Sequence, residues 1–295
     1  MIKYATLGGA QLFVGAAAIF ARFALSGAGP VAVSWLRLGI AALVVAAVVL
    51  RRQAKTLDAR REIVLVVAGV ALAVHFAGWI ASLEFTSIAI ATLLVCTSPI
   101  FTAIYDALAQ RRAPGIFFWL ALGCGVLGML LVVANKSAVA PIPGHALAGA
   151  VLALLGAIAM AVYLTIVRTV RSGLTTLQIV ARTYTWAALT LIPLAFVLGE
   201  PPPPFHDATA WFGILAMALI SQLLGHTAMN NALRHFTPTT VGFSTLLEPV
   251  IAAVLAALVF GEALALTTLA GGVVLLGAIG FALRDSMQFE AEPEL

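Results

Sequence analysis

Apolar stretches of about 20 residues recur along almost the whole of this 295-residue chain. A helix of that length spans the hydrocarbon core of a bilayer, where backbone groups must be paired within the segment itself. Only 9% of the residues are charged, whereas soluble domains carry about 25%. The sequence therefore predicts an all-α integral membrane protein. We expect ten transmembrane helices, at residues 4–25, 31–50, 63–83, 88–109, 115–134, 146–167, 176–198, 209–232, 239–260 and 266–284.

Basic residues gather in alternate connections between the predicted spans. If the N-terminus lies in the cytoplasm, the inside segments hold most of the 16 Lys and Arg residues, and the outside loops hold only Lys136. The positive-inside rule therefore predicts that both termini are cytoplasmic. Because this bias accounts for the net charge of +4, we do not expect nucleic-acid binding. Three arginines lie within spans or at their ends: Arg22, Arg37 and Arg182.

The two halves of the chain share a pattern of residues. Pro99 lies in the fourth span and Pro249 in the ninth, and His75 and His226 precede them at nearly the same separation. Because five spans is an odd number, a second five-span repeat enters the membrane from the opposite side. We therefore expect two inverted five-helix repeats packed around a cavity. The first repeat is placed at residues 1–135, the second at 146–285, and a disordered acidic tail at 286–295.

The two prolines are predicted to open their helices near the middle of the membrane. A proline inside a helix lacks an N–H and clashes with the carbonyl four residues earlier. Glu248 stands beside Pro249, and a carboxylate at that depth costs about 2.5–3.5 kcal/mol. Broken helices beside polar groups form binding sites in many transporters. We predict that Pro99 and Pro249 are gating hinges; the alternative is that Glu248 is a structural hydrogen-bonding group and Pro249 a simple kink.

Another set of residues follows the second proline. Pro249 is followed by Gly261 and Glu262, and then by a glycine-rich last span. On these residues the whole chain resembles the ten-helix members of the drug/metabolite transporter superfamily, with two EamA-type repeats. In the first repeat Pro99 is in place, but Arg111 and Arg112 occupy the positions of the Gly-Glu pair. Within the superfamily the chain is most similar to the amino-acid exporters, including those for aromatic amino acids.

Polar and aromatic side chains share faces of several predicted helices. In the eighth span Gln222, His226 and Asn230 fall four residues apart, on one helix face. Polar groups that face lipid are penalised, so these faces should line a cavity; the alternative is hydrogen bonding between helices. The predicted substrate-binding residues are His75, Trp79, Ser98, Phe101, Tyr163, Trp186, His226, Asn230, Ser244 and Glu248.

The resemblance implies an amino acid as substrate, and the residue types suggest how one would be held. Glu248 would receive the ammonium group, and His226, Asn230 or a backbone N–H freed by a proline would receive the carboxylate. Aromatic rings would form the wall for the side chain. The resemblance thus implies a multi-pass exporter in the inner membrane, which moves aromatic and other neutral amino acids, or related small metabolites, by alternating access.

The coupling of transport is left open by the residues. The smaller four-span relatives exchange drug for protons at a carboxylate in the first helix, and the first span here has no Asp or Glu. This absence favours uniport, with a proton-coupled drug or metabolite efflux pump as the alternative.

Two further classes of function are compatible with an apolar chain of this kind. One is a non-transporting scaffold, and the other is an intramembrane enzyme that would use Ser244 and His226. The serine lacks a G-x-S-x-G setting, and no H-E-x-x-H pair is present. We therefore expect no enzymatic activity, no cofactor and no metal, since Cys96 and Cys124 have no metal-ligand spacing. The expected partners are a small-molecule substrate and the lipid bilayer, and we expect a monomer or a weak homodimer formed through the glycines of the fifth and tenth spans.

Overall fold

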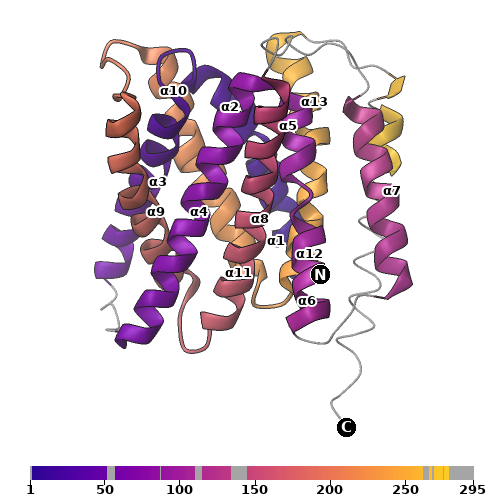
Figure 1. Ribbon diagram of the computed structural model, residues 1–295, viewed down its shortest axis with the longest axis horizontal. Helices are drawn as coiled ribbons and strands as arrows, with labels where there is room; N and C mark the ends of the chain where they lie inside the picture. The colour runs from indigo at the N-terminus through magenta and orange to yellow at the C-terminus, as the bar shows by residue number, and fades with distance from the viewer. Residues whose placement is uncertain are drawn as a thin grey trace.

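The computed structural model describes residues 2–51, 57–86, 88–109, 115–133, 145–261 and 266–278, without residues 268 and 275. Every regular element in these ranges is helical, and the long helices lie side by side in a bundle (Figure 1). Eight helices are long and apolar enough to cross a membrane. The predicted all-α membrane fold is confirmed at this level.

In the predicted fifth and tenth spans the described residues contain only shorter apolar helical segments, at Phe118–Gly128 and Leu269–Ala278. The count of ten spans therefore stays a prediction. The predicted tail at 286–295, the Arg111–Arg112 pair and Glu262 lie outside the described residues.

In the first half of the chain, two of the predicted spans are each formed by two helices. The elements of this half are α1 (Ile2–Gly15), α2 (Ala17–Ala24), α3 (Pro30–Leu50), α4 (Ala59–Phe85), α5 (Ile88–Val95), α6 (Ser98–Ala109) and α7 (Ile116–Val133). The first span consists of α1 and α2, and the fourth of α5 and α6.

In the second half the eighth and ninth spans are irregular. The elements are α8 (Ala146–Val170), α9 (Thr176–Leu198), α10 (Ala208–Ala216), the π-helix η1 (Met217–His226), α11 (Thr227–Ala232), α12 (Pro238–Ser244), the 3₁₀ turn η2 (Thr245–Leu247) and α13 (Glu248–Phe260). The eighth span consists of α10, η1 and α11. The ninth consists of α12, η2 and α13.

Local signals in the sequence set several helix ends. Asp58 caps α4 by accepting a hydrogen bond from a backbone N–H of its first turn, and Thr175 forms a capping box with Gln178 at the start of α9. Gly199 and Gly261 end α9 and α13 with φ of +68°, a left-handed conformation that favours glycine. Gly261, the glycine of the motif that follows Pro249, thus ends α13, the second helix of the ninth span.

Helices at corresponding positions of the two predicted repeats make corresponding contacts. The third span, α4, packs on the sixth, α8, and the eighth span, α10 with η1, packs on the first, α1 with α2. The equivalent second and seventh spans, α3 and α9, pack on each other, as do α6 and α12 of the fourth and ninth. Figure 1 shows α5 above α6 but α12 below α13, so the fourth and ninth spans run in opposite directions. These are the contacts and directions expected of inverted repeats.

Two equivalent crossings in this arrangement depend on glycine. A Cβ added to Gly213 on α10 would lie 2.4 Å from the backbone nitrogen of Ala24 and 2.6 Å from the carbonyl oxygen of Phe20. Where α4 meets α8, a Cβ added to Gly78 would lie 2.8 Å from the carbonyl oxygen of Leu152. Small residues let membrane helices approach this closely. The contacts between the two halves are therefore made backbone to backbone at both crossings.

The glycines of the fifth and tenth spans are not all alike. A Cβ added to Gly125 would lie 2.8 Å from the Leu246 side chain, so this glycine packs inside the protein. Additions at Gly123 and Gly277 would meet nothing within 4 Å among the described residues. The homodimer through these spans stays a prediction.

We expect the substitution Gly213→Ala to destabilise the protein by about 1–3 kcal/mol, since the new methyl group has to push two backbones apart. The matched control is Gly8→Ala on α1, where an added Cβ meets nothing within 4 Å and the alanine should be neutral or mildly stabilising. Thermal unfolding of both variants in one detergent measures the difference. Equal melting temperatures would contradict the packing described here.

Candidate functional site

The fourth and ninth spans are interrupted next to their prolines, as the sequence predicted. A turn at Cys96 and Thr97 separates α5 from α6, and η2 separates α12 from α13. Pro99 and Pro249 are each the second residue of the helix that follows. A proline is tolerated in a first turn because the N–H there has no partner within the helix. Each proline therefore starts a new helix instead of kinking an old one.

Cys96 links the two interrupted helices. Its thiol donates to the carbonyl oxygen of Thr245 at 3.3 Å, and the sulfur lies 3.9 Å from Oε2 of Glu248. In a regular helix the carbonyl oxygen of Thr245 would accept a hydrogen bond from the N–H of residue 249, which proline lacks. Here it accepts from the N–H of Glu248 as well as from the Cys96 thiol. From the sequence, Cys96 was notable only as a cysteine without metal-ligand spacing. Its position just before Pro99 is the feature that could have identified it.

A cavity of about 30 Å³ lies where these interruptions meet the other helices. Five of the ten predicted substrate residues line it: His75, Trp79, Ser98, His226 and Glu248. Cys96, Phe76 and Val14 also contribute to the wall. Since one water needs roughly 10–15 Å³ of such space, the cavity has room for about two or three waters. Residues from both halves of the chain therefore meet around one small polar space.

The two histidines face each other across the halves of the chain. Their ring centroids are 6.4 Å apart, and the Phe76 ring lies 5.0 Å from that of His226. Nδ1 of His75 lies 3.0 Å from the carbonyl oxygen of Gly156, so this nitrogen is the donor. In the neutral ring Nε2 is then left as an acceptor.

Trp79 carries an unused hydrogen-bond donor in the cavity wall. Its side chain is buried, and among the described residues Nε1 has no hydrogen-bond partner. Buried donors are paired in most proteins, by protein or by ordered water. The indole N–H is therefore free for water or for a bound solute.

Three of the other predicted site residues bind neighbouring helices instead of lining this cavity. The hydroxyl of Tyr163 donates to Oδ1 of Asn230 at 2.9 Å, and Nδ2 of Asn230 donates to the carbonyl oxygen of His226 at 2.8 Å. Ser244 accepts from Nε2 of Gln11 at 2.7 Å and donates within its own helix. The alternative of hydrogen bonding between helices describes their observed contacts.

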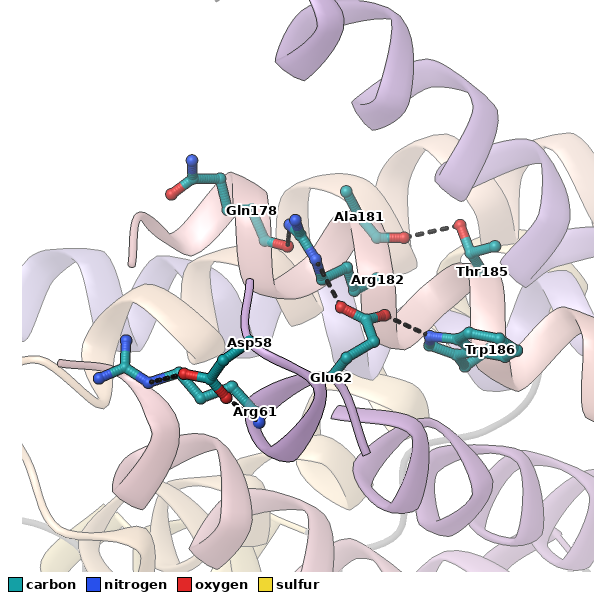
Figure 2. A network of polar contacts seen from close by, with 8 residues as sticks. All are labelled: Asp58, Arg61, Glu62, Gln178, Ala181, Arg182, Thr185 and Trp186. Atoms are coloured by element: carbon teal, nitrogen blue, oxygen red, sulfur yellow. Dashed lines mark hydrogen bonds and ion pairs between the residues drawn. The ribbon is translucent and has the colours of Figure 1, made fainter. Parts of the chain in front are cut away.

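Trp186 also lies outside the cavity, in the polar network of Figure 2. Its Nε1 donates to Oε1 of Glu62 at 2.9 Å, and Nε of Arg182 lies 3.1 Å from Oε2 of the same carboxylate. Glu62 is on α4 and the other two residues are on α9, so the network joins the third span to the seventh. Phe101, on α6, is half-buried and is also absent from the cavity wall.

Arg37 is the residue that sequence reasoning placed within a span but left without a role. It is fully buried on α3, and its Nη2 donates to Oε1 of Gln222 at 2.8 Å. The guanidinium stacks over the Phe76 ring at 4.0 Å, so Arg37 lies directly behind the cavity wall. Gln222 belongs to the π-helix η1, a geometry that is frequent at functional sites. The signal was an arginine inside an apolar segment, which by default marks a functional site.

Comparisons with known proteins identify the class. The EamA-like transporter family matches the chain at residues 2–134 and 147–284. The chain therefore belongs to the EamA-like transporter family of the drug/metabolite transporter superfamily, and the resemblance stated from the sequence is confirmed. A search of curated proteins found no match. A solved crystal structure of a protein aligns with a TM-score of 0.76 and 17% sequence identity, over 97% of this chain and 98% of the other, and shows the same fold.

We expect Trp79→Phe to weaken binding of a transported solute that accepts this hydrogen bond, because it removes one donor and keeps the ring. The loss of about 1 kcal/mol predicts a KM for uptake into proteoliposomes that is about fivefold higher. The matched control is Tyr163→Phe, which leaves Asn230 without its donor and should lower the melting temperature with little change in KM. An unchanged KM in the Trp79 variant would show that its N–H does not reach the solute.

Proposed function

We propose that the protein exports neutral amino acids, aromatic ones included, or related small metabolites, across the inner membrane by alternating access. In this proposal it acts as a carrier and not as an enzyme. The observation that carries the proposal is the polar cavity at the interruptions of the fourth and ninth spans, lined by Glu248 and the two facing histidines. Binding sites near the midplane of repeat transporters are built from such interrupted helices.

The polar groups of the cavity suit a zwitterion. Glu248 is the acidic residue among those that line it, and it would receive the ammonium group. The donors Trp79 and Ser98 would bind oxygen atoms of the solute. Asn230, an earlier candidate for the carboxylate, is already hydrogen-bonded to Tyr163 and to the backbone of His226. The binding groups are therefore expected around the cavity and not along the whole polar face of the eighth span.

The size of the cavity supports a mechanism with a conformational change. Space for two or three waters cannot hold an amino acid, so the helices around it have to separate for a solute to enter. The interrupted helices are joined directly, since the hydroxyl of Thr239 on α12 donates to Oδ2 of Asp106 on α6 at 2.7 Å. A Cβ added to Gly242, also on α12, would lie in ordinary van der Waals contact with Ser98 and Pro99. We propose that the two halves rock about this contact, with Pro99 and Pro249 as the hinges.

The proposed orientation, with both termini in the cytoplasm, is supported by where the basic residues lie. Arg61 donates to the carbonyl oxygen of Ser172 at 3.3 Å, and Arg168 and Arg171 donate to carbonyls of α11 and its C-terminal cap. Nζ of Lys3 lies 5.4 Å from the ring of Phe236, just beyond α11. One end of the bundle thus collects positive charge, as the cytoplasmic end of a membrane protein does.

We propose uniport, because the first span carries no acidic residue. The alternative is proton coupling, which would use the titratable groups that line the cavity: Glu248, His75, His226 and Cys96. These two modes differ in their response to a pH gradient, so one experiment separates them.

The test is uptake of radiolabelled phenylalanine and threonine into proteoliposomes, with and without an imposed pH gradient. Saturable uptake that is absent from empty vesicles and insensitive to the gradient supports an amino-acid uniporter. Uptake driven by the gradient would replace uniport with proton coupling. If folded protein takes up neither amino acid, the proposed substrate class is wrong.

We expect Glu248→Gln to lower kcat/KM for amino-acid uptake by tenfold or more, since hydrogen bonds to charged groups contribute about 1.5–3 kcal/mol. The amide has nearly the same shape as the carboxylate, so the variant should stay folded in the membrane. Uptake kinetics and a melting curve check the two statements. Normal transport by this variant would contradict the role of Glu248 as the ammonium partner.

Pro249→Ala should slow turnover more than it changes affinity. Alanine restores an N–H that can bond to the carbonyl of Thr245, so η2 and α13 become part of a more continuous and stiffer helix. We expect kcat to fall several-fold at a KM within about twofold of wild type, measured by uptake. A gain in melting temperature with unchanged kcat would assign Pro249 to packing alone.

A further inference from the structure

Arg37 is a buried cation that lacks an acidic partner. Its side chain is 0% exposed, yet its Nε and Nη1 have no hydrogen-bond partner among the described residues. Within that part of the chain no carboxylate lies within 4.0 Å of the guanidinium; its contacts are Oε1 of Gln222 and the face of Phe76. Buried charges in proteins are normally paired and hydrogen-bonded, so this arrangement is incomplete as it stands.

The neighbouring amide adds a further unused donor. Oε1 of Gln222 accepts from Arg37, and Nε2 of the same amide is buried and also lacks a partner among the described residues. Three unpaired donor nitrogens, two of them on a cation, therefore lie together in a buried position. Donors without acceptors around a positive charge are complementary to an anion.

The position of this pair relates it to the substrate cavity. The guanidinium packs on one face of Phe76, and Phe76 itself lines the cavity beside His226. Glu248 lines the same cavity and supplies the opposite charge. The Phe76 ring thus lies between the buried guanidinium of Arg37 and the cavity that Glu248 lines.

We propose that Arg37 and Gln222 form an anion site that binds a carboxylate group when Phe76 turns aside. For its preferred ligand, the carboxylate of a transported amino acid, the inference rests on the proposed function: the zwitterion is held with its ammonium at Glu248 and its carboxylate at Arg37. A small inorganic anion such as chloride has the same chemistry and is the other possible source. The experiment has one arm for each.

Binding is measured on the full-length protein in detergent by calorimetry and by the shift in melting temperature. The probes are 3-phenylpropionate, which keeps the carboxylate and lacks the ammonium, and phenethylamine, which keeps the ammonium and lacks the carboxylate. Sodium chloride is titrated separately at constant ionic strength, with sodium isethionate, a bulky sulfonate, as the balancing salt.

Two variants test the site in different ways. Arg37→Gln removes the positive charge. Gln222→Glu leaves Arg37 in place and gives it an internal carboxylate, which should occupy the site without lowering the melting temperature. The second variant decides the question if the first fails to fold. The control is Thr183→Val on α9, which removes a buried hydroxyl group and leaves the hydrogen bond between Arg37 and Gln222 unchanged.

We expect both variants to weaken binding of 3-phenylpropionate at least tenfold, with phenethylamine unaffected and the control equal to wild type. Chloride binding that depends on Arg37, without carboxylate binding, would support the anion site with an inorganic ligand. If folded wild-type protein binds no anion, or if both variants bind 3-phenylpropionate as wild type does, the inference is overturned. If folded wild-type protein in proteoliposomes takes up neither phenylalanine nor threonine, while anion binding still depends on Arg37, the proposed function is rejected and this site is kept.

Discussion

Every backbone polar group in the lipid has to find a partner inside the protein, and the structure depends on how this is achieved at two prolines. In the ninth span the carbonyl of Thr245 cannot bond to Pro249, and it accepts instead from the N–H of Glu248 and from the thiol of Cys96. The break is therefore closed by a side chain of the opposite half of the chain. The interruption of the ninth span and the link through Cys96 are consequences of the same missing N–H.

The halves of the chain also meet at two crossings of other helices. Glycines at the crossings of α10 with α2 and of α4 with α8 bring backbones into contact there. The structure thus combines close-packed crossings with a small polar cavity. The proposed alternating-access mechanism uses both, because in it the two halves move as bodies while the groups between them exchange partners.

Much of this could be predicted from the sequence, because it depends on local chemistry. Segment length predicted the membrane helices, proline predicted the interruptions, and the matching positions of His75 and His226 in the two halves predicted that both belong to one cavity. What could not be predicted depends on which side chains meet in space. Trp186 was expected at the substrate but is bound to Glu62, and Arg37 gained its importance only when Phe76 and Gln222 were found against it. Helical periodicity tells which residues share a face but not what that face contacts.

Because Cys96 lies in the wall of the cavity, chemical modification of its thiol can report on the accessibility of the cavity. The chain has two cysteines; Cys96 is 1% exposed in the wall of the cavity, whereas Cys124 is exposed on the outer surface of the bundle. With Cys124 replaced by serine, the remaining thiol would meet a water-soluble alkylating reagent only during the intervals in which the centre is open. In the proposed alternating-access mechanism, the rate of its modification measures how often the two halves separate, without a label or an engineered residue near the site.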